Sequence, residues 1–209
     1  MVSVGVMGTT TDPAAPANLD ASGWEALWAP YDERTYRQVL QWLGPADTVL
    51  EIGAGDLRLA RRLAAKTRRV YAVEVNRALL ANQPPAPGNL TVIWGDAYRI
   101  PFPTAITVAV LLMRHCQGFA ALLEKLHYVG CRRLITNARW RVGLELINLE
   151  RAPTPYPTAG LGWYACRCGA TGFIPGPADE LTPQIESIMQ EVFDCPACAN
   201  RHTSYTSQV

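Results

Sequence analysis

A glycine-containing turn with acidic neighbours is the first segment of this sequence that indicates chemistry. In V-L-E-I-G-A-G-D-L-R, Glu51 lies near the end of an apolar run, and Gly53 and Gly55 follow it just before a helical pattern begins. Glycine adopts backbone conformations that other residues avoid and lets the backbone approach a ligand closely. The turn, which ends at Asp56, therefore predicts a ligand site between a strand and a helix.

Two further carboxylates follow later apolar runs. Glu74 lies in V-Y-A-V-E-V-N, 21 residues after Gly53, and Asp96 lies in V-I-W-G-D-A. A carboxylate can accept two hydrogen bonds from a ribose diol, which suits Glu74. Asp96 can accept from the exocyclic amine of adenine, while the Ala97 amide donates to a ring nitrogen. These residues predict a nucleoside cofactor; the alternative is that the carboxylates only cap strands and helices.

Four cysteines near the carboxyl terminus form a second candidate site. Cys166 and Cys168 are separated by 26 residues from the pair Cys195 and Cys198, and four thiolates suit tetrahedral zinc. The first pair has one intervening residue instead of the usual two, and His202 is a spare ligand. Disulfides are the alternative, although nothing in the sequence indicates an oxidising compartment. A closed four-cysteine site has no open coordination position, so we expect structural zinc.

The segment after the fourth apolar run supplies the candidates for acting on a substrate. It reads L-L-M-R-H-C-Q, and His115 is the predicted general base because the ordinary pKa of histidine lies near neutral pH. Cys116 is a candidate nucleophile, and Asn137 ends the next run in L-I-T-N-A-R-W. The structural alternatives are a His115 satisfied by the backbone and a Cys116 buried as a small apolar side chain.

Alternating strand and helix patterns must position these residues. Helical spacing occurs at residues 36–43, 57–66 and 119–126, and a short helix follows Asn76. Short apolar strands are predicted at residues 49–52, 70–75, 90–94, 106–113 and 133–136. Such strands, separated by helices, indicate a parallel sheet covered on both faces. We therefore predict a doubly wound, mostly parallel α/β fold with its ligand site at the carboxyl ends of the strands.

The last third of the chain predicts a smaller, zinc-ribbon-like element. Strands are expected at residues 143–149 and 163–166, on either side of a proline-rich loop. Residues 182–193 predict a helix, because Thr182 can cap it, Pro183 suits its first position and apolar residues follow at helical spacing. The expected organisation is a flexible tail over residues 1–22, a cofactor-binding domain over 23–150 and the zinc-binding element over 151–209.

Composition limits the classes of partner. The 209 residues are 49% hydrophobic and 18% charged, with a net charge of +1, which gives no reason to expect DNA or a membrane surface. No apolar run reaches the ~18 residues that span a bilayer, and the start of the chain lacks a secretory signal, so we expect a cytoplasmic protein. Arginine clusters at residues 61–69 and 132–141 would contact phosphates only if they shared a face.

The segment E-I-G-A-G-D-L-R-L-A resembles motif I of the class I S-adenosylmethionine-dependent methyltransferases, which reads acidic-x-Gly-x-Gly-x-Gly at the end of the first strand. Glu74 is similar to the ribose-binding acidic residue of that family, and Gly95, Asp96 and Ala97 are similar to its adenine-side motif. The resemblance covers about residues 33–140 and departs at Leu57, where the family has its third glycine.

This resemblance implies a methyltransferase that binds S-adenosylmethionine through Glu51, Gly53, Gly55, Glu74, Asp96 and Ala97. Glu51 would lie near the methionine amino group. It also suggests that residues 143–149 and 163–166 are the strand pair that the family adds at the sheet edge. The methyl acceptor stays open among a small molecule, a protein and an RNA. The Asn-or-Asp-Pro-Pro-aromatic signature of many amine methyltransferases is missing, which weakens the case for a nucleic-acid base amine.

Two alternatives accompany this interpretation. A nicotinamide dehydrogenase is disfavoured because Asp56 places a negative charge where a pyrophosphate would bind, and Arg58 replaces a small packing residue. A sulfonium cofactor is positively charged and tolerates the acidic neighbours. The second alternative is a binding or assembly module without catalysis, which Leu57 and the missing acceptor signature keep open.

Overall fold

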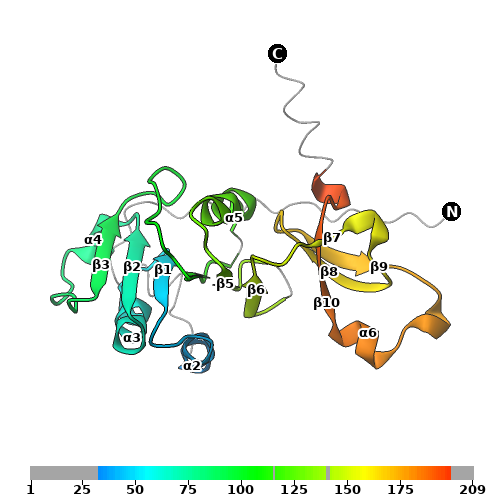
Figure 1. The fold of residues 1–209 in the computed structure, drawn as a ribbon, viewed down its shortest axis with the longest axis horizontal. Helices are drawn as coiled ribbons and strands as arrows, with labels where there is room; N and C mark the ends of the chain where they lie inside the picture. Colours follow the sequence, from blue (N-terminus) through cyan, green and yellow to red (C-terminus); the bar gives the residue numbers. More distant parts are fainter. Residues whose placement is uncertain (1–32, 115, 140–141, 199–209) are drawn as a thin grey trace, which may run out of the picture.

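The computed structural model describes residues 33–114, 116–139 and 142–198 of the chain, and its ribbon is drawn in Figure 1. The larger unit contains α2 (Glu33–Gln41), β1 (Thr48–Ile52), α3 (Arg58–Lys66), β2 (Arg69–Glu74), α4 (Arg77–Leu80), β3 (Leu90–Trp94), β4 (Val108–Leu111), α5 (Phe119–Tyr128), β5 (Arg133–Thr136) and β6 (Glu145–Asn148). The smaller unit contains β7 (Thr154–Pro155), the 3-10 helix η1 (Tyr156–Thr158), β8 (Gly162–Cys166), β9 (Thr171–Ile174), the 3-10 helix η2 (Ala178–Glu180), α6 (Pro183–Ser187) and β10 (Met189–Phe193).

The larger unit is built on a six-stranded sheet with the order β3-β2-β1-β4-β5-β6. Its first five strands pair in parallel, and β6 pairs antiparallel with β5. Every residue of β1 and β4 is buried, as expected for central strands covered on both faces. The prediction of a doubly wound, mostly parallel sheet is confirmed. The strand order reverses direction between β1 and β4, and this is where such sheets bind ligands.

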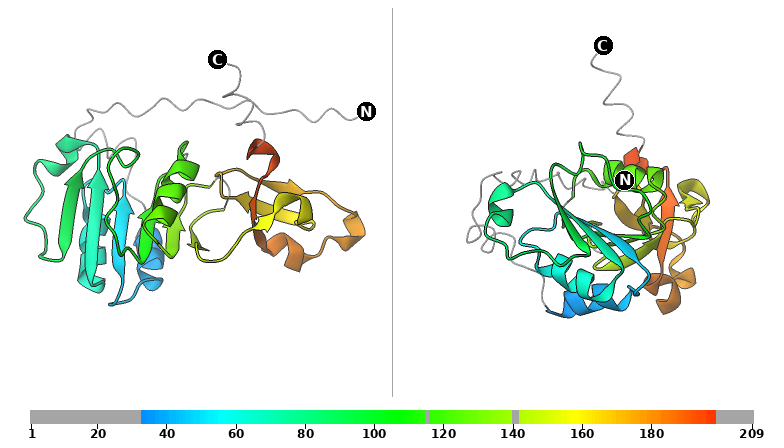
Figure 2. Two further views of the ribbon diagram at one scale, coloured as in Figure 1. Left: turned by 45° about the horizontal axis from the view of Figure 1, so that its top comes forward. Right: turned by 60° about the vertical axis from the view of Figure 1, so that its left-hand side comes forward.

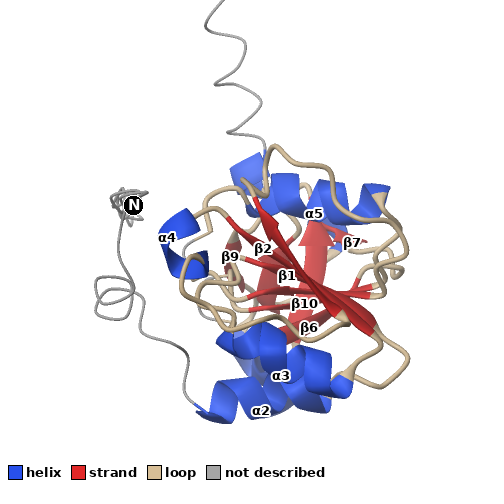
Figure 3. Ribbon diagram, turned by 90° about the vertical axis from the view of Figure 1, so that its left-hand side faces the viewer, coloured by secondary structure: helices blue, strands red, loops and turns tan. Residues whose placement is uncertain are grey.

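Two apolar layers cover the sheet, because successive side chains of a strand point to opposite faces. Val49 packs with Val39 and Leu63 in the layer formed by α2 and α3. Its neighbour Leu50 packs with Leu122 in the opposite layer, beneath α5. Figure 3 shows α2 and α3 on one side of the strands and α5 on the other.

The smaller unit is a four-stranded sheet with the order β7-β10-β8-β9. β8 and β9 form an antiparallel hairpin, and β10 lies between β7 and β8, parallel to both. Its core is small: Tyr164 and Val192 are buried beside the cysteines, and the Tyr164 ring meets Tyr156 edge-on at 5.0 Å. In Figure 2 this sheet lies beside the larger one, next to β6.

The helix predicted over residues 182–193 is wrong beyond its first turn. α6 is capped by Thr182, whose hydroxyl accepts from the Ile185 amide, but it ends at Ser187. Residues 189–193 form β10 instead, where pairing with two strands satisfies their backbone groups. Short apolar runs fit both the helical and the strand period, so long-range pairing decides between them.

The predicted pair of edge strands is half correct. β6 lies at the edge of the larger sheet, as expected for residues 143–149. The strand at residues 163–166 is β8, and it belongs to the second sheet, so the cysteine unit does not grow out of the last strand of the first. The tail predicted at residues 1–22 lies outside the described ranges, within which no helix is long and apolar enough to cross a membrane.

Candidate cofactor and metal sites

The glycine turn is held against the neighbouring strand by its own backbone. Gly53 and Gly55 have φ values of 75° and 56°, the left-handed region that glycine adopts readily. The amides of Gly53 and Ala54 donate to the Val73 carbonyl oxygen at 2.9 and 3.0 Å. The turn therefore has a defined shape at the carboxyl ends of β1 and β2.

Leu57 keeps the backbone conformation of a glycine. Its φ is 64°, a left-handed conformation that costs an ordinary residue about 1–2 kcal/mol. Its side chain is 2% exposed and packs in the α2–α3 layer with Tyr36 and Val39. The departure from the three-glycine pattern thus places apolar volume in the core layer, and the turn retains its shape.

Glu74 joins the turn to the end of the second strand. Its Oε2 accepts from the Gly55 amide at 2.7 Å and its Oε1 accepts from the Asn76 amide at 2.7 Å. Each oxygen keeps a further lone pair for a ligand hydroxyl. Asn76 in turn caps α4, because its side-chain oxygen accepts from the Ala78 amide at 3.0 Å.

Glu51 is the most unusual group in this region. It is 5% exposed, and its Oε2 atom is buried without a hydrogen-bond partner. Burial, together with the charges of Glu74 and Asp56, raises the pKa of Glu51 well above its usual value. A buried carboxylate that repels its neighbours is stabilised by a cation, so the site suits a positively charged ligand.

Asp56 is paired within the turn. Its Oδ2 accepts from Arg58 Nε at 2.7 Å, and its Oδ1 accepts from the Arg58 amide at 3.2 Å. Three carboxylates, those of Glu51, Asp56 and Glu74, are thus close enough to influence one another. This acidic environment opposes the pyrophosphate of a dinucleotide, as the sequence predicts.

The loop after β3 places the predicted adenine ligands. Asp96 Oδ1 accepts from the Tyr98 amide at 2.9 Å, and Asp96 Oδ2 lies 3.3 Å from Arg99 Nε. Lys125 of α5 donates to the carbonyl oxygens of Ala97 and Ile100. The loop is therefore tied to α5, with the Asp96 side chain partly exposed.

Tyr98 is a residue that the sequence interpretation missed. Its ring is 45% exposed and packs directly on Gly118, where a Cβ would lie 2.4 Å from the ring. Its hydroxyl lies 3.5 Å from Cys116 Sγ. The only local signal was an aromatic residue two positions after Asp96, and its contact with residues 116–118 depends on the tertiary fold.

The residues predicted to act on the substrate are His115, Cys116 and Asn137, and the structure describes two of them. His115 lies outside the described residues. Burial raises the pKa of Cys116, which makes it a poor nucleophile at neutral pH. Met113 approaches the glycine turn, since a Cβ at Gly53 would lie 3.1 Å from its Cε. Asn137 is half-buried, and its Oδ1 has no partner.

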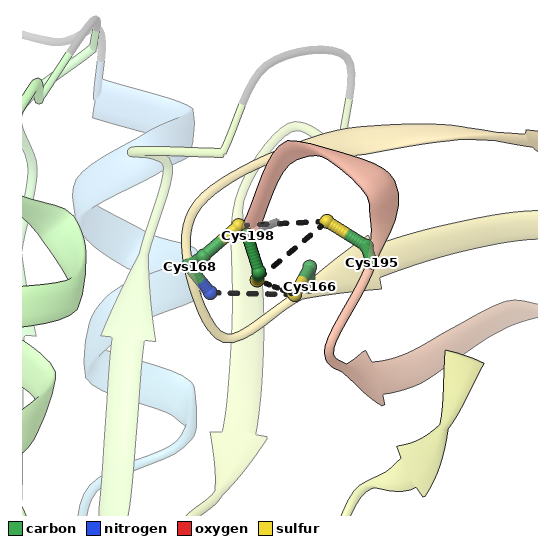
Figure 4. A group of neighbouring side chains, drawn as sticks. All are labelled: Cys166, Cys168, Cys195 and Cys198. Atoms are coloured by element: carbon green, nitrogen blue, oxygen red, sulfur yellow. Dashed lines mark hydrogen bonds between the residues drawn. The ribbon is translucent and has the colours of Figure 1, made fainter. Parts of the chain in front are cut away.

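The four predicted metal-binding cysteines converge, as Figure 4 shows. Their Sγ atoms all lie within 4.8 Å of one another. The Cys166–Cys198, Cys168–Cys195 and Cys195–Cys198 sulfur pairs are separated by 3.7, 3.6 and 3.9 Å. Cys166 ends β8 and Cys168 follows it in the β8–β9 turn, and the other two follow β10.

This geometry fits a tetrahedral metal and excludes disulfides. Zn–S bonds of ~2.3 Å give sulfur–sulfur edges of roughly 3.8 Å, close to the three separations above. A disulfide requires about 2.05 Å, and all four cysteines are free thiols. The hydrogen bond with Cys168 and burial raise the pKa of Cys166 to about 12, so a bound cation would displace protons. The spare ligand His202 lies outside the described residues.

Several described arginines of the two clusters are paired with other groups of the protein. Arg61 donates to the carbonyl oxygens of Pro84 and Pro85, and Arg62 binds Glu33. Arg133 pairs with Asp47. A cavity of about 390 Å³, lined in part by Arg68, Arg69 and Asn89, lies at the amino ends of the strands, opposite the glycine turn.

A family model identifies this arrangement. Residues 32–134 match the model described as ribosomal RNA adenine dimethylase. This segment is thus similar to that family, and the order of its sheet is typical of the methyltransferase fold. Within this methyltransferase fold, the matched segment includes the glycine turn, Glu74 and Asp96, and it ends within β5. The four-cysteine unit lies beyond it.

Curated relatives match this chain over a shorter segment. The probable ribosomal RNA small subunit methyltransferase A of Methanosarcina barkeri is 45% identical over 64 residues, which are 29% of this chain and 22% of the relative. The ribosomal RNA small subunit methyltransferase A of Pelotomaculum thermopropionicum is 46% identical over 63 residues, 29% of this chain and 21% of the relative. The chain thus covers about a fifth of the length of these relatives.

Solved structures with a similar fold include two methyltransferases. A dimethyladenosine transferase from Plasmodium falciparum has a TM-score of 0.41 and 20% identity, covering 50% of this chain and 41% of its own. A TehB-like S-adenosylmethionine-dependent methyltransferase from Corynebacterium glutamicum has a TM-score of 0.46 and 16% identity, covering 56% of this chain and 68% of its own.

Proposed function

We propose that this protein transfers a methyl group from S-adenosylmethionine to an RNA acceptor. The observation that carries the proposal is the buried Glu51 carboxylate, whose Oε2 has no hydrogen-bond partner, beside a glycine turn that is bonded to Glu74. S-adenosylmethionine is a nucleoside with a ribose diol and a positively charged methionine end, so it matches both features. The RNA acceptor is suggested by the matched family model and by the names of the curated relatives.

The cofactor residues have distinct roles in this proposal. Glu74 would bind the ribose diol, Asp96 and the Ala97 amide would bind adenine, and Glu51 would face the methionine amino group. Gly53 and Gly55 would leave room for the cofactor backbone. When bound, the sulfonium supplies the transferable methyl group. The protein contributes orientation and exclusion of water, which are worth several kcal/mol in reactions of this kind.

The acceptor would approach the residues that follow β4. This chain has Leu112, Met113 and Arg114 there, without the Asn-or-Asp-Pro-Pro-aromatic signature, so other groups must hold the acceptor atom. His115 is our proposed general base. The same departure favours a second candidate function, a module that binds the cofactor and RNA without transferring the methyl group.

We also propose that the four thiolates hold a structural zinc ion. The support is the donor set of four cysteines and their tetrahedral separations. Four thiolates leave no open coordination position, so the metal would stabilise the fold of the second sheet instead of acting on a substrate.

Calorimetric titration with S-adenosylmethionine, with NADH and a Glu74→Ala variant in parallel, tests the cofactor. We expect saturable binding of S-adenosylmethionine that weakens in the variant; tight NADH binding, or no binding of either, would overturn the assignment. Transfer of a tritiated methyl group to transcribed small-subunit rRNA then tests the activity. Binding without transfer to that RNA or to other RNAs would favour the non-catalytic module.

A further inference from the structure

A buried guanidinium joins the two sheets of this protein. Arg139 is 2% exposed, and its Nε donates to Glu145 Oε1 at 2.7 Å. Its Nη2 also binds Glu145 and lies 2.7 Å from Glu191 Oε2. Glu145 belongs to β6 of the first sheet and Glu191 to β10 of the second. One side chain therefore bridges carboxylates from both units.

A second contact joins the metal-binding turn to α5. A Cβ at Gly169 would lie 3.2 Å from Phe119 Cβ, so the turn that carries Cys166 and Cys168 packs directly on the first residue of the helix. Arg167, within the same turn, lies 3.3 Å from the His127 ring at the other end of α5. Figure 1 shows α5 and β6 on the side of the first sheet that faces the second.

Both contacts lie at the edge of the sheet where the acceptor would bind. Arg139 is three residues beyond the carboxyl end of β5, and Phe119 follows the segment after β4 that contains Met113 and Cys116. The cofactor residues Glu51 and Glu74 are on β1 and β2 and make neither contact. The four-cysteine unit is thus fastened to the acceptor half of the larger unit.

We propose that Arg139 is a positioning residue, which holds the four-cysteine unit against the carboxyl edges of β4 and β5 so that this unit forms a wall of the acceptor site. The inference rests on the proposed methyltransferase function. Its geometric basis is that Arg139 binds both Glu145 and Glu191, and that Gly169 packs on Phe119. Loss of the bridge loosens the acceptor wall and leaves the cofactor residues in place.

The first test uses the full chain with Glu191→Gln, a change that keeps the side-chain shape and leaves Glu145 to balance Arg139. We expect unchanged zinc content by mass spectrometry and an S-adenosylmethionine Kd within about twofold of wild type. Amide hydrogen exchange in α5 and β5 should accelerate. The kcat/KM for transcribed small-subunit rRNA should fall roughly ten- to hundredfold, since small misplacements near a reacting centre have effects of this size.

Two further variants separate positioning from folding. Arg139→Lys keeps the charge but loses the planar fork, and it should reproduce the faster exchange with zinc retained. Asp47→Asn is the matched control, because it removes an ion pair to Arg133 at the amino ends of the strands, 2.8 Å in length. The control should leave exchange in α5 and the kcat/KM for rRNA unchanged.

The readouts distinguish this inference from the proposed function. Wild-type exchange rates and kcat/KM in Glu191→Gln would overturn the positioning role while the methyltransferase assignment stands. Slower transfer with unaltered exchange in α5 and β5 would also overturn it, because the wall would not have moved. If the wild-type protein transfers no methyl group to RNA, the proposed function fails. Faster amide exchange in both Glu191→Gln and Arg139→Lys would still support the role of Arg139 in holding the four-cysteine unit.

Discussion

The cofactor site and the cysteine site both gather groups that favour a cation, but the protein supports them differently. Glu51 on β1, Glu74 on β2 and Asp56 surround a glycine turn whose backbone is bonded to β2, over a large apolar core. The cysteines extend from two turns above a core of a few side chains. We therefore expect the first scaffold to be stable without its ligand and the second to depend on a bound metal for its fold.

Metal removal should produce the largest difference between the two regions. We expect chelation, or Cys195→Ser, to unfold the second sheet, because a structural zinc site contributes on the order of 10 kcal/mol to a small fold. The larger sheet should retain its structure. Amide hydrogen exchange of β8 and β10 compared with β1 and β4 measures this. Equal protection of both sheets after chelation would show that the smaller core is sufficient by itself.

Leu57→Ala should lower the stability of the larger unit without weakening its binding of the cofactor. The side chain is fully buried in the α2–α3 layer, so its truncation should destabilise the protein by about 2–5 kcal/mol in urea unfolding. The backbone turn is retained, and the S-adenosylmethionine Kd should change by less than about threefold at temperatures where the variant is folded. A large loss of affinity would place Leu57 in the cofactor site.

Glu51→Gln should stabilise the ligand-free protein and weaken the cofactor. The substitution removes a buried carboxylate that lacks a partner and repels its neighbours, so the free energy of unfolding should rise by roughly 1–3 kcal/mol. In our proposal the same change removes the charge that faces the cation, so calorimetry should show a Kd weaker by about tenfold or more. Tighter binding in the variant would contradict the role that we propose for Glu51.

The raised pKa of Glu51 predicts a smaller, pH-dependent effect of the same origin. Because burial raises the folded-state pKa above 4.5, the stability that this group contributes is present below its unfolded pKa and is lost as pH rises through the folded pKa. A bound cation lowers that pKa, so S-adenosylmethionine affinity should rise with pH over the same interval, with release of protons. Titrations in buffers of different ionisation enthalpy measure the release, and Glu51→Gln should abolish it.

The sequence predicts much of the larger unit because its signals are local. The strand at residues 49–52, the turn at Gly53 and Gly55 and the carboxylates that follow later strands all depend on neighbours a few positions away. Parallel strands then bring their carboxyl ends to one edge, which is where Glu74 meets the Gly55 amide. The cluster of four cysteines is equally predictable from the sequence, because metal ligands have characteristic residue types and spacing.

The features that sequence reasoning missed depend on partners far along the chain. β10 was predicted as helix because its apolar spacing fits both periods, and only pairing with β7 and β8 decides. Tyr98 contacts Cys116 on the other side of β4 along the chain, and no local sequence pattern indicates this contact. Arg139 belongs to the arginine cluster considered from the sequence for phosphate contacts, whereas in the structure it is buried and paired with two glutamates from different sheets.

The sequence by itself determined the doubly wound fold and identified the candidate cofactor carboxylates and candidate metal ligands, because backbone propensity, side-chain period and ligand chemistry act over short distances. Only the tertiary structure decided that Leu57 packs in the core, that the cysteine unit has a sheet of its own, and that Arg139 bridges glutamates of the two sheets. The physical reason is that burial and ion pairing are properties of the assembled chain, and distant segments supply their partners.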